Sequence, residues 1–136
     1  MFNSLTPAMC KTKSLLILRI VLAVVLVMHG YPKLFGGIEM FTGMLQSLQF
    51  PLPVVFAWVV ALLEFVGGLA LLAGLFTRYV ASLVAVQFIV ILIFVKKFAF
   101  PASDLDLLIL GVALALALMG AGAWSLDAAF NLEKKK

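Results

Sequence analysis

Residues 54–78 read VVFAWVVALLEFVGGLALLAGLFTR, an apolar segment with a single carboxylate, Glu64, near its middle. If this segment is a helix that rises about 1.5 Å per residue, Glu64 lies roughly 16 Å from Pro53 and roughly 21 Å from Arg78. The hydrocarbon core of a bilayer is about 30 Å thick, so this carboxylate is predicted to lie near mid-membrane. An ionisable group at that depth is costly unless it faces protein or water, which makes Glu64 a candidate functional residue.

The helical face around Glu64 consists mostly of small side chains. Because helical side chains repeat about every 3.6 residues, the residues within about 60° of Glu64 can be read from the sequence. They are Ala57, Ala61, Gly67, Gly68 and Leu71. Small residues let membrane helices approach each other closely. We therefore expect Glu64 to point into a helix bundle and away from lipid.

The composition of the whole chain indicates a membrane protein. Of its 136 residues, 65% are hydrophobic and only 12% are charged, and the mean hydropathy is +1.24. A water-soluble domain contains about twice as much charge. At this length we expect one domain, residues 1–136. The basic residues stand at the ends of apolar segments and form no patch, so the net charge of +4 indicates no nucleic-acid partner.

Cysteine and histidine are scarce in this chain. Cys10 is the single cysteine, which excludes an internal disulfide and a CxxC redox pair. His29 is the single histidine and no ligand cluster accompanies it in the sequence, so we expect no metal site.

Four apolar segments predict four transmembrane helices, at about residues 14–30, 54–76, 79–95 and 105–123. No small-x-small cleavage site follows the first segment, so we expect a retained helix and not a signal peptide. The predicted fold is all-α, a four-transmembrane-helix bundle. In the first extracytoplasmic loop, apolar residues at helical spacing predict a short amphipathic helix at the membrane surface. These residues are Ile38, Phe41, Leu45 and Leu48.

The basic residues also predict how the chain is oriented in the membrane. Seven are on the side of the two termini: Lys11, Lys13, Arg19, Arg78, Lys134, Lys135 and Lys136. Three are on the opposite side: Lys33, Lys96 and Lys97. We therefore predict a multi-pass protein of the plasma (inner) membrane with both termini in the cytoplasm. Trp124, which follows the last span, is expected at the membrane interface.

Four polar residues are predicted to lie at membrane depth: Arg19, His29, Glu64 and Gln87. Measured from the cytoplasmic edge at about 1.5 Å per residue, Arg19 lies roughly 9 Å deep, Gln87 roughly 14 Å and Glu64 roughly 20 Å. The side chains of Arg19 and Glu64 together can span the gap between them. Such a pair has two interpretations. It is either part of a charged pocket that holds a polar head group or relays a proton, or an ion pair that only fixes helix register.

The segment HGYPK, residues 29–33, ends the first predicted span on the outer side. Lys33 can extend to the interface and His29 is a candidate proton carrier, although both residues can equally serve as plain interfacial anchors. A quinone fits this chemistry, with its apolar tail in lipid and its carbonyls accepting hydrogen bonds from His29, Arg19 or Gln87. The predicted ligand-binding residues are therefore Glu64, Arg19, His29, Lys33 and Gln87.

Several motifs together make the chain resemble the DoxX family of small four-span membrane proteins. They are the arginine in the first span followed by HGYPKLFGG (29–37), then EFVGGLALLAGLFTR (64–78), DLDLL (104–108) and GAGAWSLD (120–127). The resemblance covers about residues 15–127. One departure is Ala121, which stands where the family commonly has a proline, so this turn is expected to bend less sharply.

The resemblance implies redox-associated membrane biology. DoxX-like proteins are linked with subunits of quinol oxidase or thiosulfate:quinone oxidoreductase, and with complexes that handle oxidative stress. Arg19, His29, Lys33 and Glu64 match recurring polar positions of the family, and the match alone gives them no catalytic role.

Three functions remain open from the sequence. The first is a redox-associated subunit that binds a quinone or another small hydrophobic ligand near Glu64. It would act with a partner protein that supplies the redox centre, as a quinone-linked oxidoreductase subunit and not as a stand-alone enzyme. The second is a structural or assembly subunit of a membrane complex. The third is a small proton-coupled exporter, which would work as a homo-oligomer packed through the small residues at 67–68 or 113–117.

Overall fold

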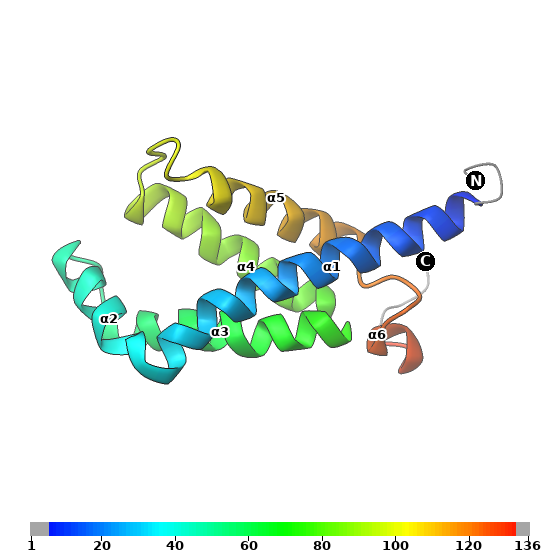
Figure 1. The fold of residues 1–136 in the computed structure, drawn as a ribbon, viewed down its shortest axis with the longest axis horizontal. Coiled ribbons are helices and arrows are strands. Elements are labelled where there is room, and N and C mark those ends of the chain that lie inside the picture. The colour runs from blue at the N-terminus through cyan, green and yellow to red at the C-terminus, as the bar shows by residue number, and fades with distance from the viewer. Residues whose placement is uncertain (1–5, 133–136) are drawn as a thin grey trace.

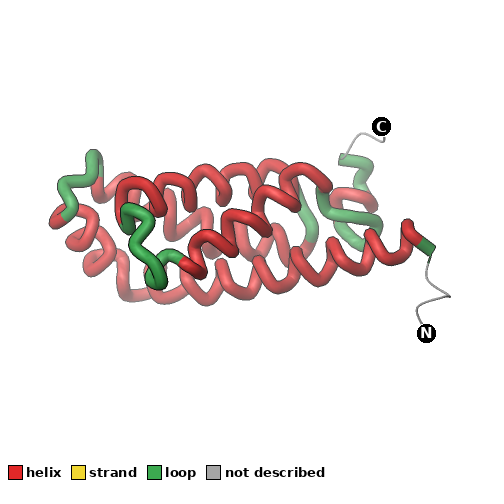
Figure 2. The backbone as a smooth tube through the Cα atoms, turned by 90° about the horizontal axis from the view of Figure 1, so that it is seen from above, coloured by secondary structure: helices red, strands yellow, loops and turns green. Residues whose placement is uncertain are grey.

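The computed structural model describes residues 6–132, and this part of the chain is helical without any strand. In chain order the elements are α1 (Pro7–Pro32), the π-helical η2 (Lys33–Gly37), α2 (Ile38–Ser47), α3 (Pro53–Ala73), α4 (Thr77–Val90), the π-helical η3 (Ile91–Val95), α5 (Asp104–Met119) and α6 (Leu126–Ala129). The long helices α1, α3, α4 and α5 run lengthwise in one elongated bundle (Figures 1 and 2). The prediction of an all-α fold is therefore confirmed.

Three segments of the described chain are long and apolar enough to cross a membrane: Pro7–Ser47, Pro53–Ala73 and Thr77–Val95. The segment predicted as the fourth span contains α5, which has 16 residues. A helix that crosses the hydrocarbon core perpendicularly needs about 20. The membrane character of the fold is thus supported, and the exact count of four spans remains a prediction.

The first helix begins earlier than the polarity of its sequence indicates. Residues 1–13 read as a polar tail, yet α1 starts at Pro7, with the Thr6 hydroxyl accepting a hydrogen bond from the Met9 backbone N–H at 3.3 Å. A threonine before a proline is a typical helix start, because the hydroxyl caps free N–H groups and proline lacks the N–H that would need capping. The N-terminal end of α1 extends beyond the other long helices (Figure 1).

A kink in η2 separates α1 from α2. Phe35 and Gly36 leave helical geometry there, and Gly36 has φ = 152°, a value that side chains other than hydrogen rarely tolerate. The chain then turns away from the bundle, so that α2 projects at an angle at one end (Figure 1). Of the α2 residues only Leu45 is buried. The position of this helix at a membrane surface remains a prediction.

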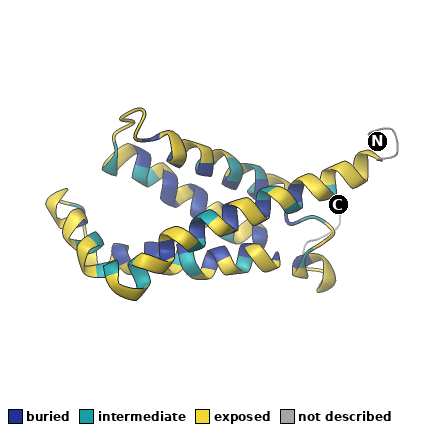
Figure 3. Cartoon of the chain, viewed as in Figure 1, coloured by how far each residue is buried: buried dark blue, intermediate teal, exposed yellow. Residues whose placement is uncertain are grey.

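The core of the bundle is apolar, and so is most of its outer surface. Buried side chains line the inner faces of the long helices (Figure 3): Leu15, Leu22, Leu26, Leu71, Val84, Phe88, Ile109 and Leu116. Large apolar side chains also face outward, for example Ile17, Leu108 and Leu118. In water such a surface would be unfavourable, whereas acyl chains solvate it without cost.

Two glycines bring α1 close to α3, its main neighbour in the bundle. A Cβ atom added at Gly30 would lie 2.5 Å from the backbone nitrogen of Phe65, and one at Gly68 would lie 2.8 Å from a methyl carbon of Val27. A Cβ at Gly68 would also lie 3.1 Å from the Ala23 carbonyl oxygen, so the α1 and α3 backbones approach closely at both glycines. This close approach is what the small residues around Glu64 predicted.

Different segments of the chain lie at the two ends of the bundle. At one end, here called the capped end, residues 120–132 fold back beside the α3–α4 turn and the first turns of α1 (Figure 1). At the other end, the loop end, lie η2, α2 and the α4–α5 connection (Figure 1). At the loop end Lys96 forms an ion pair with Asp106.

Candidate functional site

Glu64 faces the interior of the bundle. Its side chain is 2% exposed, and the buried face of α3 comprises Ala57, Val60, Ala61, Glu64, Gly67, Gly68 and Leu71. All five residues that the helical period placed beside Glu64 belong to this face. The prediction that this carboxylate points away from lipid is confirmed.

Both oxygens of the Glu64 carboxylate are bonded to side chains from other elements. The Lys33 ammonium, from η2, donates to Oε2 at 2.6 Å, and the Gln87 amide, from α4, donates to Oε1 at 2.8 Å. The three residues, here called the Lys33–Glu64–Gln87 cluster, thus join three separate elements. In an apolar interior a carboxylate with two such donors is far less costly than an isolated one.

The backbone of α1 explains why Lys33 reaches Glu64. A Cβ at Gly30 would lie 2.9 Å from the Cβ of Glu64, so α1 passes directly beside this residue. Lys33 follows Gly30 by three residues and therefore lies on the same side of the helix. Its ammonium also lies 4.9 Å from the ring centre of Phe41 in α2, within the range of a cation–π interaction.

Some hydrogen-bonding groups of the cluster have no partner within the protein. The Gln87 carbonyl oxygen, Oε1, is buried and has no hydrogen-bond partner. The Lys33 side chain is 23% exposed, and an ammonium has three N–H donors. The cluster therefore offers a spare acceptor and spare donors to a ligand that carries a hydroxyl or carbonyl group.

Three aromatic residues adjoin members of this cluster in the sequence. Tyr31, Phe35 and Phe65 pack in tilted and edge-to-face arrangements, with ring centres 4.8 to 6.2 Å apart. Tyr31 and Phe35 are largely exposed on the surface of the bundle. Their rings form an exposed apolar surface on the side of Lys33 and Phe65.

The predicted pair of Arg19 and Glu64 does not form. Arg19 is buried, but its two terminal nitrogens donate to the backbone carbonyls of Ala121 at 2.7 Å and Trp124 at 2.8 Å. These acceptors come from the capped end, where the turn after α5 presents its carbonyls to α1. The guanidinium instead lies beside Gly74, ten residues along α3 from Glu64, and there the two carbonyls accept its hydrogen bonds.

His29 also lies outside the cluster. It is exposed, and its Nδ1 is 2.8 Å from the Val25 carbonyl of its own helix. Three of the five predicted residues, Lys33, Glu64 and Gln87, therefore meet, while Arg19 and His29 are elsewhere. Metal binding receives no support either, because residues 6–132 contain no group of three acidic, histidine or cysteine side chains placed to hold an ion.

Asp127 has a role that the sequence reading missed. It is buried, and its carboxylate accepts hydrogen bonds from the backbone N–H groups of Phe76 at 2.6 Å and Thr77 at 2.9 Å. Phe76 has a positive φ and offers no side-chain cap of its own. Asp127 therefore caps α4 from 50 residues away, and only its place in the GAGAWSLD motif singles it out in the sequence.

We expect Asp127→Ala to destabilise the capped end by about 1–2 kcal/mol, because two N–H groups at the start of α4 lose their acceptor. Thermal unfolding in detergent measures the change. Asp104→Ala is the matched control, since Asp104 is exposed in the first turn of α5 and caps no buried N–H group. Equal shifts for the two variants would contradict this role of Asp127.

Comparison with known proteins identifies relatives along most of the chain. The family model DoxX matches residues 14–97. A Bacillus subtilis (strain 168) protein named "Putative oxidoreductase CatD" is 35% identical over 118 residues, which cover 82% of this chain and 83% of the relative. The Escherichia coli (strain K12) "Inner membrane protein YqjF" is 33% identical over 123 residues, covering 85% and 91%. No solved structure matches the chain.

Proposed function

The chain belongs to the DoxX family of membrane proteins, and from this premise we propose that it is a redox-associated subunit with a quinone site at the Lys33–Glu64–Gln87 cluster. The observation that carries the proposal is the buried, unpartnered Oε1 of Gln87 beside an ammonium–carboxylate pair. A ligand hydroxyl would give this oxygen the hydrogen bond that it lacks.

The residues of the cluster fit the two oxidation states of such a ligand. The Lys33 ammonium can donate a hydrogen bond to a quinone carbonyl, and Gln87 Oε1 can accept one from the hydroxyl of the reduced form. The ring would lie against Phe41 or Phe65, and the isoprenoid tail would leave over the exposed aromatic surface on the side of Lys33. A bound quinone supplies two-electron, two-proton chemistry to the site.

Glu64 is the group that can hold a proton in this arrangement. Its carboxylate keeps a hydrogen bond from Gln87 whether it is charged or neutral, since one oxygen remains an acceptor after protonation. Lys33 donates to the other oxygen and is itself partly exposed. A proton would leave Glu64 through Lys33 in two steps: the ammonium first releases one of its own protons at the surface, and the resulting amine then accepts the proton from Glu64.

A partner protein is proposed to supply the redox centre, because the sequence has one cysteine and one histidine. The oxidoreductase name of the B. subtilis relative supports a redox role, and the name of the E. coli relative supports the inner membrane as the location. The distribution of basic residues further supports cytoplasmic termini, although Lys134, Lys135 and Lys136 lie outside the described residues.

A structural or assembly subunit is the second candidate. It is favoured by the full use of both Glu64 oxygens, which lets the cluster join η2, α3 and α4 without any ligand. In this case the polar residues would only fix helix register.

Quinone retention in Gln87→Leu tests the proposal. We expect wild-type protein purified in mild detergent to yield quinone on organic extraction, and the variant to retain about fivefold less, since one hydrogen bond contributes about 1 kcal/mol. Helical circular dichroism should be unchanged. The matched control is Gln46→Leu, in the exposed part of α2, which should retain quinone as wild type does.

Two results would contradict the quinone site. If wild-type protein yields no quinone under any mild extraction, the cluster is not a quinone site. If Gln87→Leu lowers the unfolding temperature while its quinone content equals that of wild type, the structural role is the correct one.

A further inference from the structure

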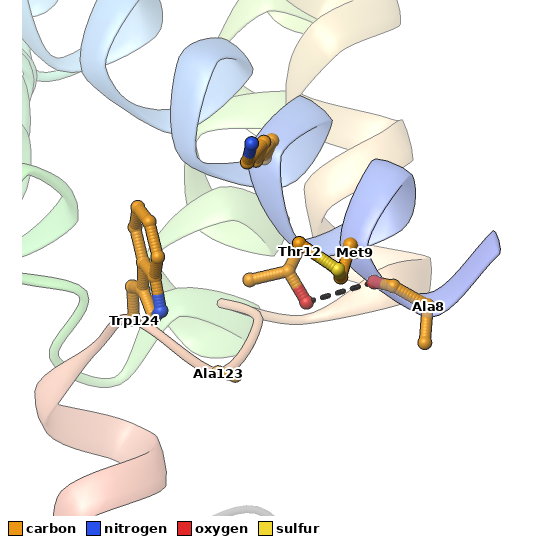
Figure 4. Close-up of a pocket in the computed structure, with 6 residues that line it drawn as sticks. Ala8, Met9, Thr12, Ala123 and Trp124 are labelled. Atoms are coloured by element: carbon orange, nitrogen blue, oxygen red, sulfur yellow. Dashed lines mark hydrogen bonds between the residues drawn. The ribbon is translucent and has the colours of Figure 1, made fainter. Parts of the chain in front are cut away.

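A small cavity lies at the capped end of the bundle. It is lined by none of the residues of the Lys33–Glu64–Gln87 cluster. Its volume is about 210 Å³, and it opens between the first turns of α1 and the segment that follows α5 (Figure 4). The lining residues are Ala8, Met9, Thr12, Lys13, Ala123 and Trp124. Nothing in the proposed function uses this cavity.

The lining is apolar except at one edge. Met9, the two alanines and the Trp124 ring provide the apolar walls (Figure 4). The Thr12 hydroxyl already donates to the Ala8 carbonyl at 3.0 Å within α1. Lys13 is exposed and is the single charged residue of the lining. A ligand that fits must therefore combine a negative charge with an apolar body.

The electrostatic surroundings also favour an anion. The first turn of α1 contains no acidic residue, and Lys11 adds a second exposed positive charge nearby. Asp127, the one described carboxylate at this end, is buried and its oxygens accept from backbone N–H groups. The other described carboxylates belong to α2, α3 and the start of α5. Among residues 6–132, therefore, no exposed acid at this end repels a phosphate group.

The cavity is also at the right depth for a lipid head group. Leu15, two residues after Lys13, is 2% exposed and begins the buried core of α1, while residues 6–14 are almost entirely exposed. Trp124 is 60% exposed, and tryptophan side chains favour the boundary between head groups and acyl chains. The cavity thus lies where the apolar part of the helix ends.

We propose that this cavity binds one anionic phospholipid, with the phosphate at Lys13 and the glycerol and upper acyl segments against Met9 and Trp124. Charge complementarity with Lys13 selects the anionic head group, and the apolar lining selects a lipid over free phosphate. This inference is independent of the quinone proposal, because the two sites share no residue.

Quenching of Trp124 fluorescence tests the lipid site. The chain has two tryptophans, so Trp58→Phe leaves Trp124 as the single reporter. The protein is placed in phosphatidylcholine vesicles that contain spin-labelled phosphatidylglycerol or, for comparison, spin-labelled phosphatidylcholine. We expect the anionic label to quench at about fivefold lower mole fraction, because one lysine near an anionic membrane surface contributes about 1 kcal/mol.

Variants of two neighbouring lysines distinguish a specific lipid site from general attraction of anionic lipid to a positively charged surface. Lys13→Gln should abolish the preference for the anionic lipid, because this side chain lines the cavity. Lys11→Gln, two residues away and outside the lining, should keep it. In a further variant, Ala8→Phe fills the cavity and should reduce quenching by the anionic label.

The proposal is overturned if the two lysine variants lose the preference equally, or if the anionic and zwitterionic labels quench equally in the Trp58→Phe protein. Millimolar inorganic phosphate should leave the quenching unchanged. If phosphate displaces the lipid label, the cavity is a phosphate site and the assignment to phospholipid is wrong.

Discussion

Glu64→Gln is expected to destabilise the protein by about 3 kcal/mol. The substitution preserves size and leaves an acceptor for Gln87, but it removes the negative charge opposite the Lys33 ammonium. Lys33 is then a cation without its counterion in an apolar setting. Its partial exposure, 23% of the side chain, keeps the expected cost at the lower end of the range for buried pairs.

Denaturation by sodium dodecyl sulfate, followed by circular dichroism, measures this loss. Glu39→Gln is the control, because Glu39 is exposed on α2 and the change in net charge is the same. The double variant Lys33→Met/Glu64→Gln should recover most of the stability, since both charges are removed together. If Glu64→Gln is as stable as Glu39→Gln, the ion pair contributes nothing to the fold.

The double variant also separates the two candidate functions. A cluster that only holds helices together should regain its stability and leave any bound quinone unaffected. A quinone site should regain stability and still lose the ligand, because the ammonium that donates to the quinone carbonyl is gone. The same protein preparation gives both readouts, so a misfolded variant is not mistaken for an empty site.

The inward direction of Glu64 was predictable because it depends on local periodicity. Small residues at helical spacing mark one face of α3, and a helix buries one face as a unit. The start of α1 at Pro7 was not predicted, because residues 1–13 read as a polar tail, although threonine followed by proline is a local signal for a helix start. In both cases a short stretch of chain contains the whole cause.

The partners of the charged residues were not predictable in the same way. Arg19 donates to carbonyls 102 and 105 residues away, and these carbonyls are presented by a turn in which Gly120 and Gly122 both have positive φ. Backbone acceptors carry no sequence signature, so only the closed fold shows them. Likewise, Lys33 was expected to extend to the membrane interface, whereas the close approach of α1 at Gly30 directs it to Glu64.

Gly30→Ala is expected to destabilise the bundle by about 3 kcal/mol, at the upper end of the range for overpacked sites. The added methyl group would lie 2.5 Å from the Phe65 backbone nitrogen and 2.9 Å from the Glu64 Cβ. Neither is the flexible end of a side chain that can rotate away, so α1 and α3 must separate. Separation would also pull Lys33 from Glu64, and the variant should lose quinone together with stability.

Gly111→Ala provides the matched control for this prediction. Gly111 lies in the interior of α5, and apart from its chain neighbours and the backbone of its own helix no atom is within 4 Å of the position where its Cβ would be. Because alanine has the higher helix propensity, this variant should be neutral or more stable by up to about 1 kcal/mol. Glycine-to-alanine substitution is thus expected to lower stability at Gly30 and to leave it unchanged or raise it at Gly111. The difference comes from the contact between α1 and α3. Equal midpoints for the two variants in detergent denaturation would show that the α1 and α3 backbones are not in close contact at Gly30. The explanation given for the position of Lys33 beside Glu64 would then be wrong.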